Sequence, residues 1–211
     1  MRPLLLASGN AKKLRELRDL CGGLPLRVLG PDDLPHGLPE VVEDGTTFRA
    51  NAEKKALAAA EVAARAFGAA AWALADDSGL CVDALQSAPG VRSARFAGVG
   101  GAGRDAANNA LLLERLRGLP EGRRGAEFRC CIAVASPGRV LFTAEGAVRG
   151  RILQAPDGDG GFGYDPIFYH VESGTSFACL SAAAKAAISH RGRAMTEARA
   201  RLAAGLTGAS A

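Results

Sequence analysis

The sequence predicts an α/β protein that folds as a single domain with two lobes. Short apolar runs ending in turn residues alternate with longer segments whose apolar residues recur at helical spacing. The 211 residues suffice for one large domain or two small ones, and they contain no internal repeat and no linker-like stretch. We therefore treat residues 1–211 as one domain in which strands and helices alternate.

The first strand and helix are predicted at the N-terminus. Leu4–Ala7 is a short apolar run, and the turn residues Ser8-Gly9-Asn10 separate it from a helix over about residues 11–21. Lys13 lies in the first turn of that helix. Free N–H groups and a cation converge there, which suits a phosphate. An ordinary strand-to-helix connection with a surface lysine explains the same pattern, and both interpretations stay open.

A long helix is predicted in the second quarter of the chain. Its N-cap is Thr46 or Thr47, and Gly68 stops an alanine-rich segment that runs to about Phe67. The remaining strands are expected at 26–29, 80–82, 127–135, 140–148 and 167–169, and two further helices at about 105–117 and 182–188. Ser189-His190-Arg191-Gly192 is expected to break the second of these, and a last helix follows it to about Leu202. The last nine residues are expected to be frayed.

Two adjacent carboxylates follow a predicted buried strand. The apolar run of residues 71–75 leads directly into Asp76 and Asp77. In open α/β sheets this end of a strand is where ligands bind. Neighbouring side chains of a strand point to opposite faces, so we expect only one aspartate to reach a given site. A solvated strand end with a turn at Ser78-Gly79 is the alternative.

A glycine-rich stretch, residues 158–166, is the second unusual feature. Its glycines let the backbone approach a ligand closely, and Phe162, Tyr164 and Asp165 could contact a base or a sugar. Most such loops are turns, so the stretch alone is weak support. Further along, three basic side chains gather within seven residues: Lys185, His190 and Arg191. They could equally be the solvated end of a helix.

The composition is that of an ordinary globular protein and disfavours a nucleic-acid partner. Charged residues make up 23% and hydrophobic residues 48% of the chain. The formal net charge of +4 is small and spread out, so it favours anions without demanding nucleic acid. Aromatic residues are only 5%, too few for a surface on which bases stack.

The cysteines and the apolar segments predict a cytoplasmic protein with no membrane partner. The five cysteines are odd in number and match no zinc spacing, so we expect reduced thiols. No apolar stretch is long enough to span a membrane. The first three residues and the four apolar residues after them do not form a signal peptide.

The order of the polar stretches is more informative than any one of them. Six stretches follow one another: Ser8-x-Asn10-x-x-Lys13, Gly45-x-Thr47-Phe48-x-x-Asn51-Ala52, Ala75-Asp76-Asp77-Ser78-Gly79-Leu80, Pro89-Gly90-x-x-Ser93-Ala94-Arg95-Phe96, Gly161-Phe162-Gly163-Tyr164-Asp165-Pro166 and Ile188-Ser189-His190-Arg191-Gly192. In this order they resemble the inosine triphosphate pyrophosphatase family, whose bacterial members are the dITP/XTP pyrophosphatases. The resemblance runs from Leu4 to about Arg201, and the last two stretches together are highly specific.

The resemblance implies an activity and a fold. The activity is hydrolysis of the non-standard purine nucleoside triphosphates ITP, dITP and XTP to the monophosphate and pyrophosphate, which cleanses the nucleotide pool. The fold is a two-lobed α/β domain around a long mixed β-sheet flanked by helices. A magnesium requirement and a homodimer are also implied. The partner would be a small-molecule nucleotide.

The family's residue roles carry over by position. Asp77 would be the proton acceptor and, together with Glu43, would hold magnesium. The triphosphate would be bound by the first loop and a second lysine: Ser8, Gly9, Asn10, Ala11, Lys12, Lys13 and Lys55. Ser78 would also touch the substrate. The base and sugar would be held by Phe162, Gly163, Tyr164, Asp165, Lys185, His190 and Arg191.

The chain departs from the family pattern in three places. Ser8 stands where threonine is common, which keeps the hydroxyl. Cys179 stands where glutamate is expected, and Ala183-Ala184 replace an acidic pair just before Lys185. If that acidic pair orients the lysine, the orientation is missing here. If the pair is only surface charge, nothing is lost.

Three other functions are less consistent with the sequence. A Maf-like pyrophosphatase has a similar fold and acts on other nucleotides, but His190-Arg191 argue against it. A nucleotide-binding regulator without turnover would not need the water-activating carboxylates Asp77 and Glu43. A nucleic-acid-binding module is disfavoured by the modest charge and the few aromatic residues.

Overall fold

The computed structural model describes residues 1–207, and the chain divides into two compact units. Unit 1 comprises Met1–Asp77, Cys130–Glu145 and the chain from Arg193 onward. Unit 2 comprises Ser78–Arg129 and Gly146–Gly192. Within residues 1–207, no helix combines the length and the apolar character that a membrane crossing needs.

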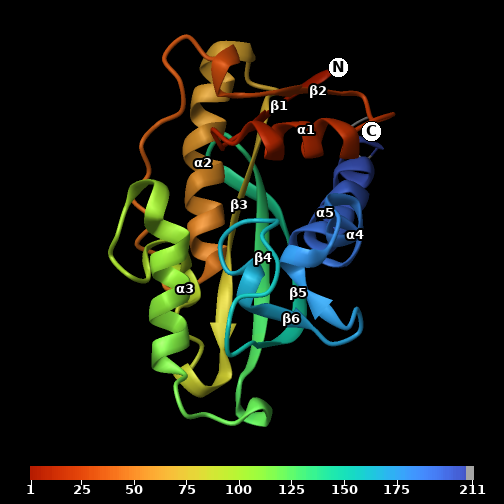
Figure 1. Ribbon diagram of the computed structural model, residues 1–211. Coiled ribbons are helices and arrows are strands. Elements are labelled where there is room, and N and C mark those ends of the chain that lie inside the picture. Colours follow the sequence, from red (N-terminus) through yellow and green to blue (C-terminus); the bar gives the residue numbers. More distant parts are fainter. Residues whose placement is uncertain (208–211) are drawn as a thin grey trace. The chain divides into compact units, whose positions relative to one another are not determined.

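A mixed seven-stranded sheet organises the fold (Figure 1). Its strands are β1 (Arg2–Leu6), β2 (Leu26–Leu29), β3 (Trp72–Val82), β4 (Gly125–Ser136), β5 (Arg139–Ile152), β6 (Phe168–His170) and β7 (Thr175–Ser176). The helices are α1 (Ala11–Leu20), α2 (Phe48–Phe67), α3 (Arg104–Arg115), α4 (Ala182–Ile188) and α5 (His190–Thr207). The strand order is β2-β1-β3-β4-β5-β6-β7. Strand β1 pairs parallel with β2 and β3, whereas β6 pairs antiparallel with β5 and β7. The predicted α/β class with a mixed sheet is confirmed.

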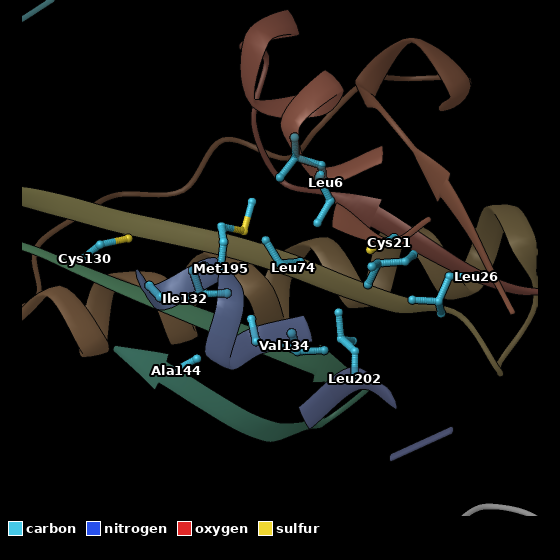
Figure 2. Packing of buried hydrophobic residues seen from close by; sticks show 14 residues of the cluster. Leu6, Cys21, Leu26, Leu74, Cys130, Ile132, Val134, Ala144, Met195 and Leu202 are labelled. Carbon is cyan, nitrogen blue, oxygen red and sulfur yellow. The ribbon is translucent and has the colours of Figure 1, made fainter. Parts of the chain in front are cut away.

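In unit 1, one face of the sheet is covered by α1 and α5. Leu74 of β3 and the β4 residues Ile132 and Val134 belong to a buried cluster that includes Met195 and Leu202 of α5. Figure 2 shows these side chains gathered around α5. The α1 and β1 residues of the same cluster are Leu17, Leu4 and Leu6. Burial of this face fixes α1 against the strand that carries the aspartate pair.

The opposite face of unit 1 is covered by α2 through very small side chains. The α2 residues in this buried cluster are Ala52, Ala56, Ala59, Ala60 and Ala63, and the strand residues include Leu5, Ala73, Ala75, Ala133 and Ala135. Alanine facing alanine lets a helix lie close to a sheet, because few atoms separate the two backbones. Polar side chains of α2 can therefore reach the end of this packed region on β3.

Local capping signals place the helix ends. The Asn10 side chain caps α1 by accepting hydrogen bonds from the N–H groups of Lys12 (2.9 Å) and Lys13 (3.3 Å). Thr47 caps α2 by accepting from the N–H of Ala50 (3.1 Å). Gly68 ends α2 with a φ of 96°, which favours glycine. These predicted boundaries are confirmed.

The strand that carries the aspartates is longer than predicted. Strand β3 has 11 residues and continues through Asp76, Asp77 and Ser78. The alternative of a turn at Ser78-Gly79 and the prediction of a separate strand at 80–82 are therefore wrong. What ends beside the aspartates is the neighbouring strand: the pairing of β1 with β3 stops at Leu6↔Leu74. The pairing with β1 therefore ends before the aspartates, although β3 itself continues beside β4.

The C-terminal helix is also longer than predicted. Helix α5 begins at His190, so the break predicted at Ser189-His190-Arg191-Gly192 is confined to Ser189. The helix runs to Thr207 instead of ending near Leu202, so residues 203–207 of the segment predicted to be frayed are helical. The rest of that segment, residues 208–211, lies outside the described residues. The predicted hairpin at 127–135 and 140–148 is present as β4 and β5, which are joined by the two residues Pro137 and Gly138.

The core of unit 2 is rich in aromatic residues, and α3 packs against it. Phe128 lies 4.6 Å from Phe168 and 4.8 Å from the His190 ring, measured between ring centroids. Leu112 of α3 and Leu116, the residue just after the helix, are fully buried in the same cluster. Helix α3 and the first residue of α5 therefore both pack against this aromatic cluster.

A buried guanidinium joins α3 to β5. Arg124 donates to three carbonyl oxygens: Leu116 O (2.8 Å), Ile152 O (2.8 Å) and Leu153 O (2.7 Å). Burial lowers the pKa of its guanidinium, which stays charged, and each of its three nitrogens donates one of these hydrogen bonds. Because one of the three acceptors lies just beyond the end of α3, Arg124 also satisfies that end of the helix.

All five cysteines are free thiols, as the sequence predicts, and they should differ in reactivity. Burial raises the pKa of the Cys21 thiol to about 11 and of Cys131 to about 12, so neither forms the reactive thiolate near pH 8. Cys179 is exposed. We expect a thiol reagent at pH 8 to label Cys179 first in the native protein and all five after denaturation, as read by peptide mass spectrometry. Rapid native labelling of Cys21 or Cys131 would contradict this assignment.

Candidate active site

The two aspartates of β3 face opposite sides of the sheet in unit 1, as their adjacency predicts. Asp76 lies on the α1 side, where both of its carboxylate oxygens accept from the Lys13 ammonium at 2.8 and 3.0 Å. Asp77 lies on the α2 side, where it contacts Asn51 and Lys55. Asp76 therefore pairs with Lys13 of α1, and Asp77 pairs with Lys55 of α2.

Lys13 is held at the N-terminal end of α1, beside the exposed first loop. The side chain of Asp76 is 7% exposed, so its two-point ion pair with Lys13 is largely shielded from water. The Ser8 hydroxyl accepts from the N–H of Asn10 at 3.3 Å. Residues 9–12 are exposed to solvent. The predicted first loop thus presents a helix N-terminus and an oriented lysine together, the arrangement that binds anions.

Lys55 stands beside two carboxylates. Its ammonium lies 3.1 Å from Glu43 Oε2 and 3.5 Å from Asp77 Oδ1. Burial raises the pKa of the Asp77 carboxyl, and the nearby Lys55 charge and the Asn51 hydrogen bond oppose that shift. A carboxylate with this tendency to hold a proton is a reasonable proton acceptor.

Asn51 is a site residue that the sequence prediction missed. It is fully buried on α2; its side-chain nitrogen donates to Asp77 Oδ2 (3.1 Å), and its side-chain oxygen accepts from the N–H of Gly45 (2.8 Å). A Cβ at Gly45 would meet that oxygen at 2.6 Å, so the close approach requires glycine. The sequence did contain a signal for this role: Asn51 belongs to one of the family-like stretches and lies one helical turn before Lys55.

The carboxylates of Glu43 and Asp77 fit a magnesium ion. Both face the same ammonium group, so their negative charges converge on one cation position. Magnesium prefers oxygen ligands and is commonly held by one or two carboxylates, with water and substrate phosphates completing its shell. Among residues 1–207, no three histidine, cysteine or acidic side chains gather at a possible metal site. The assignment of Glu43 and Asp77 as magnesium ligands stays a prediction.

In unit 2, the glycine-rich loop is organised by Asp165. The buried Asp165 carboxylate accepts from the N–H of Phe162 (2.7 Å) and forms an ion pair with Lys185. The Lys185 ammonium also lies 4.4 Å from the centroid of the Phe162 ring, and that ring is 55% exposed. A Cβ at Gly161 would overlap Asp165, and its φ of 77° also favours glycine.

The glycine-rich loop supplies a carboxylate for Lys185, although Ala183-Ala184 replace the acidic pair of the family pattern. No acidic pair precedes Lys185 in this chain, but Asp165 supplies the carboxylate that orients the lysine. Cys179, the other departure, lies beside Gly158 of the same loop, where a Cβ would meet its sulfur at 2.7 Å. The missing acidic residues therefore leave Lys185 with a defined position.

His190 and Arg191 begin α5, and the histidine is held by stacking. Its ring lies parallel to Phe128, with an angle of 11° between the planes, and the residue is 9% exposed. The Ser189 hydroxyl accepts from the N–H of Gly192 at 3.1 Å and so caps the helix start. One face of the imidazole is thus covered by an aromatic ring.

Tyr164 is a core residue of unit 2. It is 4% exposed, and its hydroxyl donates to the carbonyl oxygen of Ser93 at 2.9 Å. Burial raises the pKa of the phenol. In this structure, the ring and hydroxyl point away from solvent, which leaves the backbone as the part of Tyr164 that could contact a nucleotide. Ser78, also predicted to touch the substrate, is half-buried on β3 next to Asp77.

The predicted residues therefore gather in two groups. In unit 1 the structure brings together Lys55, Glu43 and Asp77 on the α2 side of β3, and it holds Lys13 against Asp76 on the α1 side. In unit 2 it brings together part of the predicted base-binding set: Phe162, Asp165 and Lys185. The individual roles of these residues stay predictions.

Known proteins with similar sequences and structures identify the family. The Ham1 family matches residues 4–201. A dITP/XTP pyrophosphatase of Anaeromyxobacter sp. (strain Fw109-5) is 49% identical, with 93% of this chain and 94% of the relative covered. One from Desulforamulus reducens is 50% identical, with 92% of each chain covered. The solved structure of a HAM1 protein from Coxiella burnetii is 38% identical, has a TM-score of 0.85, and is matched over 96% of this chain and 98% of its own. With the sequence motifs, the sheet and these relatives in agreement, the chain belongs to the Ham1 family.

Proposed function

We propose that this protein hydrolyses non-standard purine nucleoside triphosphates, namely dITP, XTP and ITP, to the monophosphate and pyrophosphate. The observation that carries the proposal is a pair of oriented lysines in unit 1 where the β1–β3 pairing ends. Lys13 pairs with Asp76 on the α1 side of β3, and Lys55 pairs with Glu43 and Asp77 on the α2 side. The names of its relatives, dITP/XTP pyrophosphatases that are 49–50% identical, agree with this activity. The enzyme would thus be a hydrolase that acts on acid anhydrides.

The triphosphate would be bound by the first loop and two lysines. Residues 8–12 offer backbone and side-chain donors at the N-terminus of α1, and Lys13 adds a cation that Asp76 keeps in place. Lys55 would neutralise further phosphate charge. Because these groups recognise phosphate rather than the base, they serve every nucleoside triphosphate alike.

Glu43 and Asp77 would hold magnesium, and Asp77 would act as the base. When bound, magnesium supplies charge neutralisation at the phosphate oxygens and lowers the pKa of water. Asp77 takes a proton from the attacking water, whose oxygen forms a bond to the α-phosphorus. The bond from that phosphorus to the α,β-bridging oxygen breaks, and pyrophosphate leaves with the electron pair. Lys13 and Lys55 stabilise the charge that develops on the leaving group.

The base and sugar would be held by unit 2. Phe162 offers an exposed ring for stacking, and Lys185 offers an ammonium oriented by Asp165. His190 and Arg191 would add hydrogen-bond donors at the start of α5. Tyr164 would take part through its backbone, because its side chain is buried. A homodimer and a cytoplasmic location belong to the same proposal and rest on the family resemblance.

Pyrophosphate release across a nucleotide panel tests the function. The panel comprises XTP, dITP, ITP, GTP and ATP, each with and without Mg²⁺, and the nucleotide product is identified by chromatography. The proposal expects Mg²⁺-dependent pyrophosphate and monophosphate from XTP, dITP and ITP. Orthophosphate and the diphosphate as products, or no turnover of these three, would refute it.

Substituting Lys13 should weaken catalysis with every triphosphate by a similar factor. Lys13→Ala removes a phosphate cation, and Asp76→Asn removes the charge that orients it, so both should lower kcat/KM in the same direction. The exposed α1 residue Arg15, as Arg15→Ala, is the matched control and should retain wild-type activity. A loss with ITP that is absent with ATP would contradict the phosphate role.

A further inference from the structure

The glycine-rich loop of unit 2 is gripped by two side chains of α3. The N–H of Gly163 donates to Asp105 Oδ2 at 2.7 Å, and the Gly163 carbonyl oxygen accepts from Asn109 Nδ2 at 3.0 Å. Asp105 and Asn109 are four residues apart and so lie on one face of the helix. Together they bind one residue of the loop through both its N–H and its C=O.

The gripped residue is next to the side chain proposed to meet the base. Gly163 has a φ of 61°, a left-handed conformation that its two hydrogen bonds hold in place. The N–H of Phe162 is fixed separately by Asp165. The exposed Phe162 ring therefore projects from backbone that is anchored on both sides. The Lys185 ammonium lies over the same ring, so its surroundings depend on the same anchors.

Helix α3 is itself a firm support. Asn108 accepts from the N–H of Ala97 at 2.8 Å and donates to the Ser93 carbonyl at 3.2 Å. At the other end of the helix, Arg124 donates to the carbonyl of Leu116. The loop is thus anchored to a helix whose own position is fixed by hydrogen bonds at Asn108 and at its C-terminal end.

Asn109 has a feature that helix stability does not explain. Its side-chain oxygen is buried and has no hydrogen-bond partner among residues 1–207. Leaving a buried acceptor without a donor is unfavourable, and asparagine is a poor helix former compared with alanine or leucine. The favourable contribution of this side chain is the hydrogen bond from its nitrogen to Gly163.

We propose that Asp105 and Asn109 are positioning residues for base recognition. They hold Gly163 so that Phe162 and Lys185 are presented to a purine base in one arrangement. This inference rests on the proposed function, which assigns the loop to the base. Neither residue touches the nucleotide, and the phosphate chemistry in unit 1 does not involve them.

The inference predicts a specific kinetic change. A loosened loop binds the cognate base less well, so KM for XTP rises and the preference for XTP over ATP falls, while kcat changes less. Asp105→Ala removes a charge-assisted hydrogen bond and should raise KM for XTP by about ten- to a hundredfold. Asn109→Ala removes a neutral bond and should raise it by about two- to tenfold. Asp105→Asn keeps an acceptor and should lie close to wild type.

A purely structural role must be separated from positioning. Asp105 lies in the first turn of α3, where a negative charge stabilises the helix regardless of the loop. The double variant Asp105→Ala/Ala106→Asp restores a charge at the exposed neighbouring position without the contact to Gly163. Arg104→Ala removes the Arg104–Asp105 ion pair and leaves the loop contact in place, so it is the control.

The experiment measures kcat and KM for XTP and ATP, and the melting temperature, of wild type and these variants. Positioning expects Asp105→Ala and the double variant to share a raised KM and a reduced XTP:ATP ratio, while Arg104→Ala matches wild type. Recovery of KM in the double variant, or an unchanged ratio in Asp105→Ala and Asn109→Ala, would overturn the inference alone. If Asp105→Ala does not fold, Asn109→Ala decides in the same way. A wild type without preference for XTP over ATP would overturn the proposed function, and the inference with it.

Discussion

Replacing Asp77 by asparagine is expected to lower kcat/KM for XTP by about 10²- to 10⁴-fold while the protein stays folded. Asparagine cannot accept a proton from water and is a weaker magnesium ligand than a carboxylate. The fold should survive because burial disfavours the Asp77 charge, and a neutral side chain of the same size relieves that cost. Lys55 keeps its ion pair with Glu43 in the variant.

The measurement is pyrophosphate release at saturating Mg²⁺, with the melting temperature as the check on folding. Asp76→Asn is the matched control, because it removes a carboxylate from the neighbouring position on the other face of β3. Its smaller loss should follow that of Lys13→Ala, since Asp76 acts through Lys13. Near-normal turnover by Asp77→Asn together with inactivity of Asp76→Asn would mean that the catalytic role belongs to Asp76.

ATP is expected to be the poorest substrate, by up to about 10⁴- to 10⁵-fold in kcat/KM relative to XTP or ITP. Hypoxanthine and xanthine carry an oxygen at C6, whereas adenine carries an amino group. The donors of Lys185, His190 and Arg191 can bond to an oxygen. An amino group cannot accept from them and would leave them unpaired. Exposure of the site to water reduces the discrimination, because water can satisfy the unused donors.

GTP is expected to fall between these limits. Guanine also carries the C6 oxygen, so the basic donors cannot reject it. Its difference is an amino group at C2, where hypoxanthine has hydrogen and xanthine has oxygen. Crowding or an unpaired donor at C2 gives weaker rejection than the mismatch at C6, so the expected order is XTP or ITP, then GTP, then ATP.

The His190→Phe variant tests the origin of this order. Phenylalanine keeps the ring that stacks on Phe128 and removes both ring nitrogens, so packing is preserved while hydrogen bonding is lost. The rate with ITP should fall more than the rate with ATP, and Arg191→Ala should act in the same direction. A wild-type enzyme that hydrolyses ATP as efficiently as ITP would remove the basis for the specificity and for the roles of these residues.

Local signals in the sequence were sufficient for much of the fold. Asn10, Thr47 and Gly68 act through hydrogen bonds or backbone conformation within a few residues, so the helix ends they mark are readable from the sequence. The twofold period of a strand likewise separates Asp76 from Asp77 without knowledge of the neighbouring elements. The order of the polar stretches then identified the family.

The residues that complete the site depend on long-range packing. Asp76 and its partner Lys13 are 63 residues apart, and Gly163 is 54 residues from Asn109 and 58 from Asp105. Tyr164 looked like a ligand contact in the sequence, but its ring lies in the core of unit 2. No local pattern distinguishes a tyrosine that faces the core from one that faces a nucleotide, because the loop conformation decides it.

Periodicity, capping and motif order were enough to predict most helix and strand positions, the family and the types of residue that carry the chemistry, whereas β3 and α5 are longer than these local signals indicate. Only long-range packing set the point where the pairing of β1 with β3 stops, two residues before the aspartate pair. It also decided that Asp165 rather than the absent acidic pair orients Lys185, and that α3 grips Gly163. The physical reason is that ion pairs and hydrogen bonds between distant residues form only where packing of the apolar faces brings their elements together.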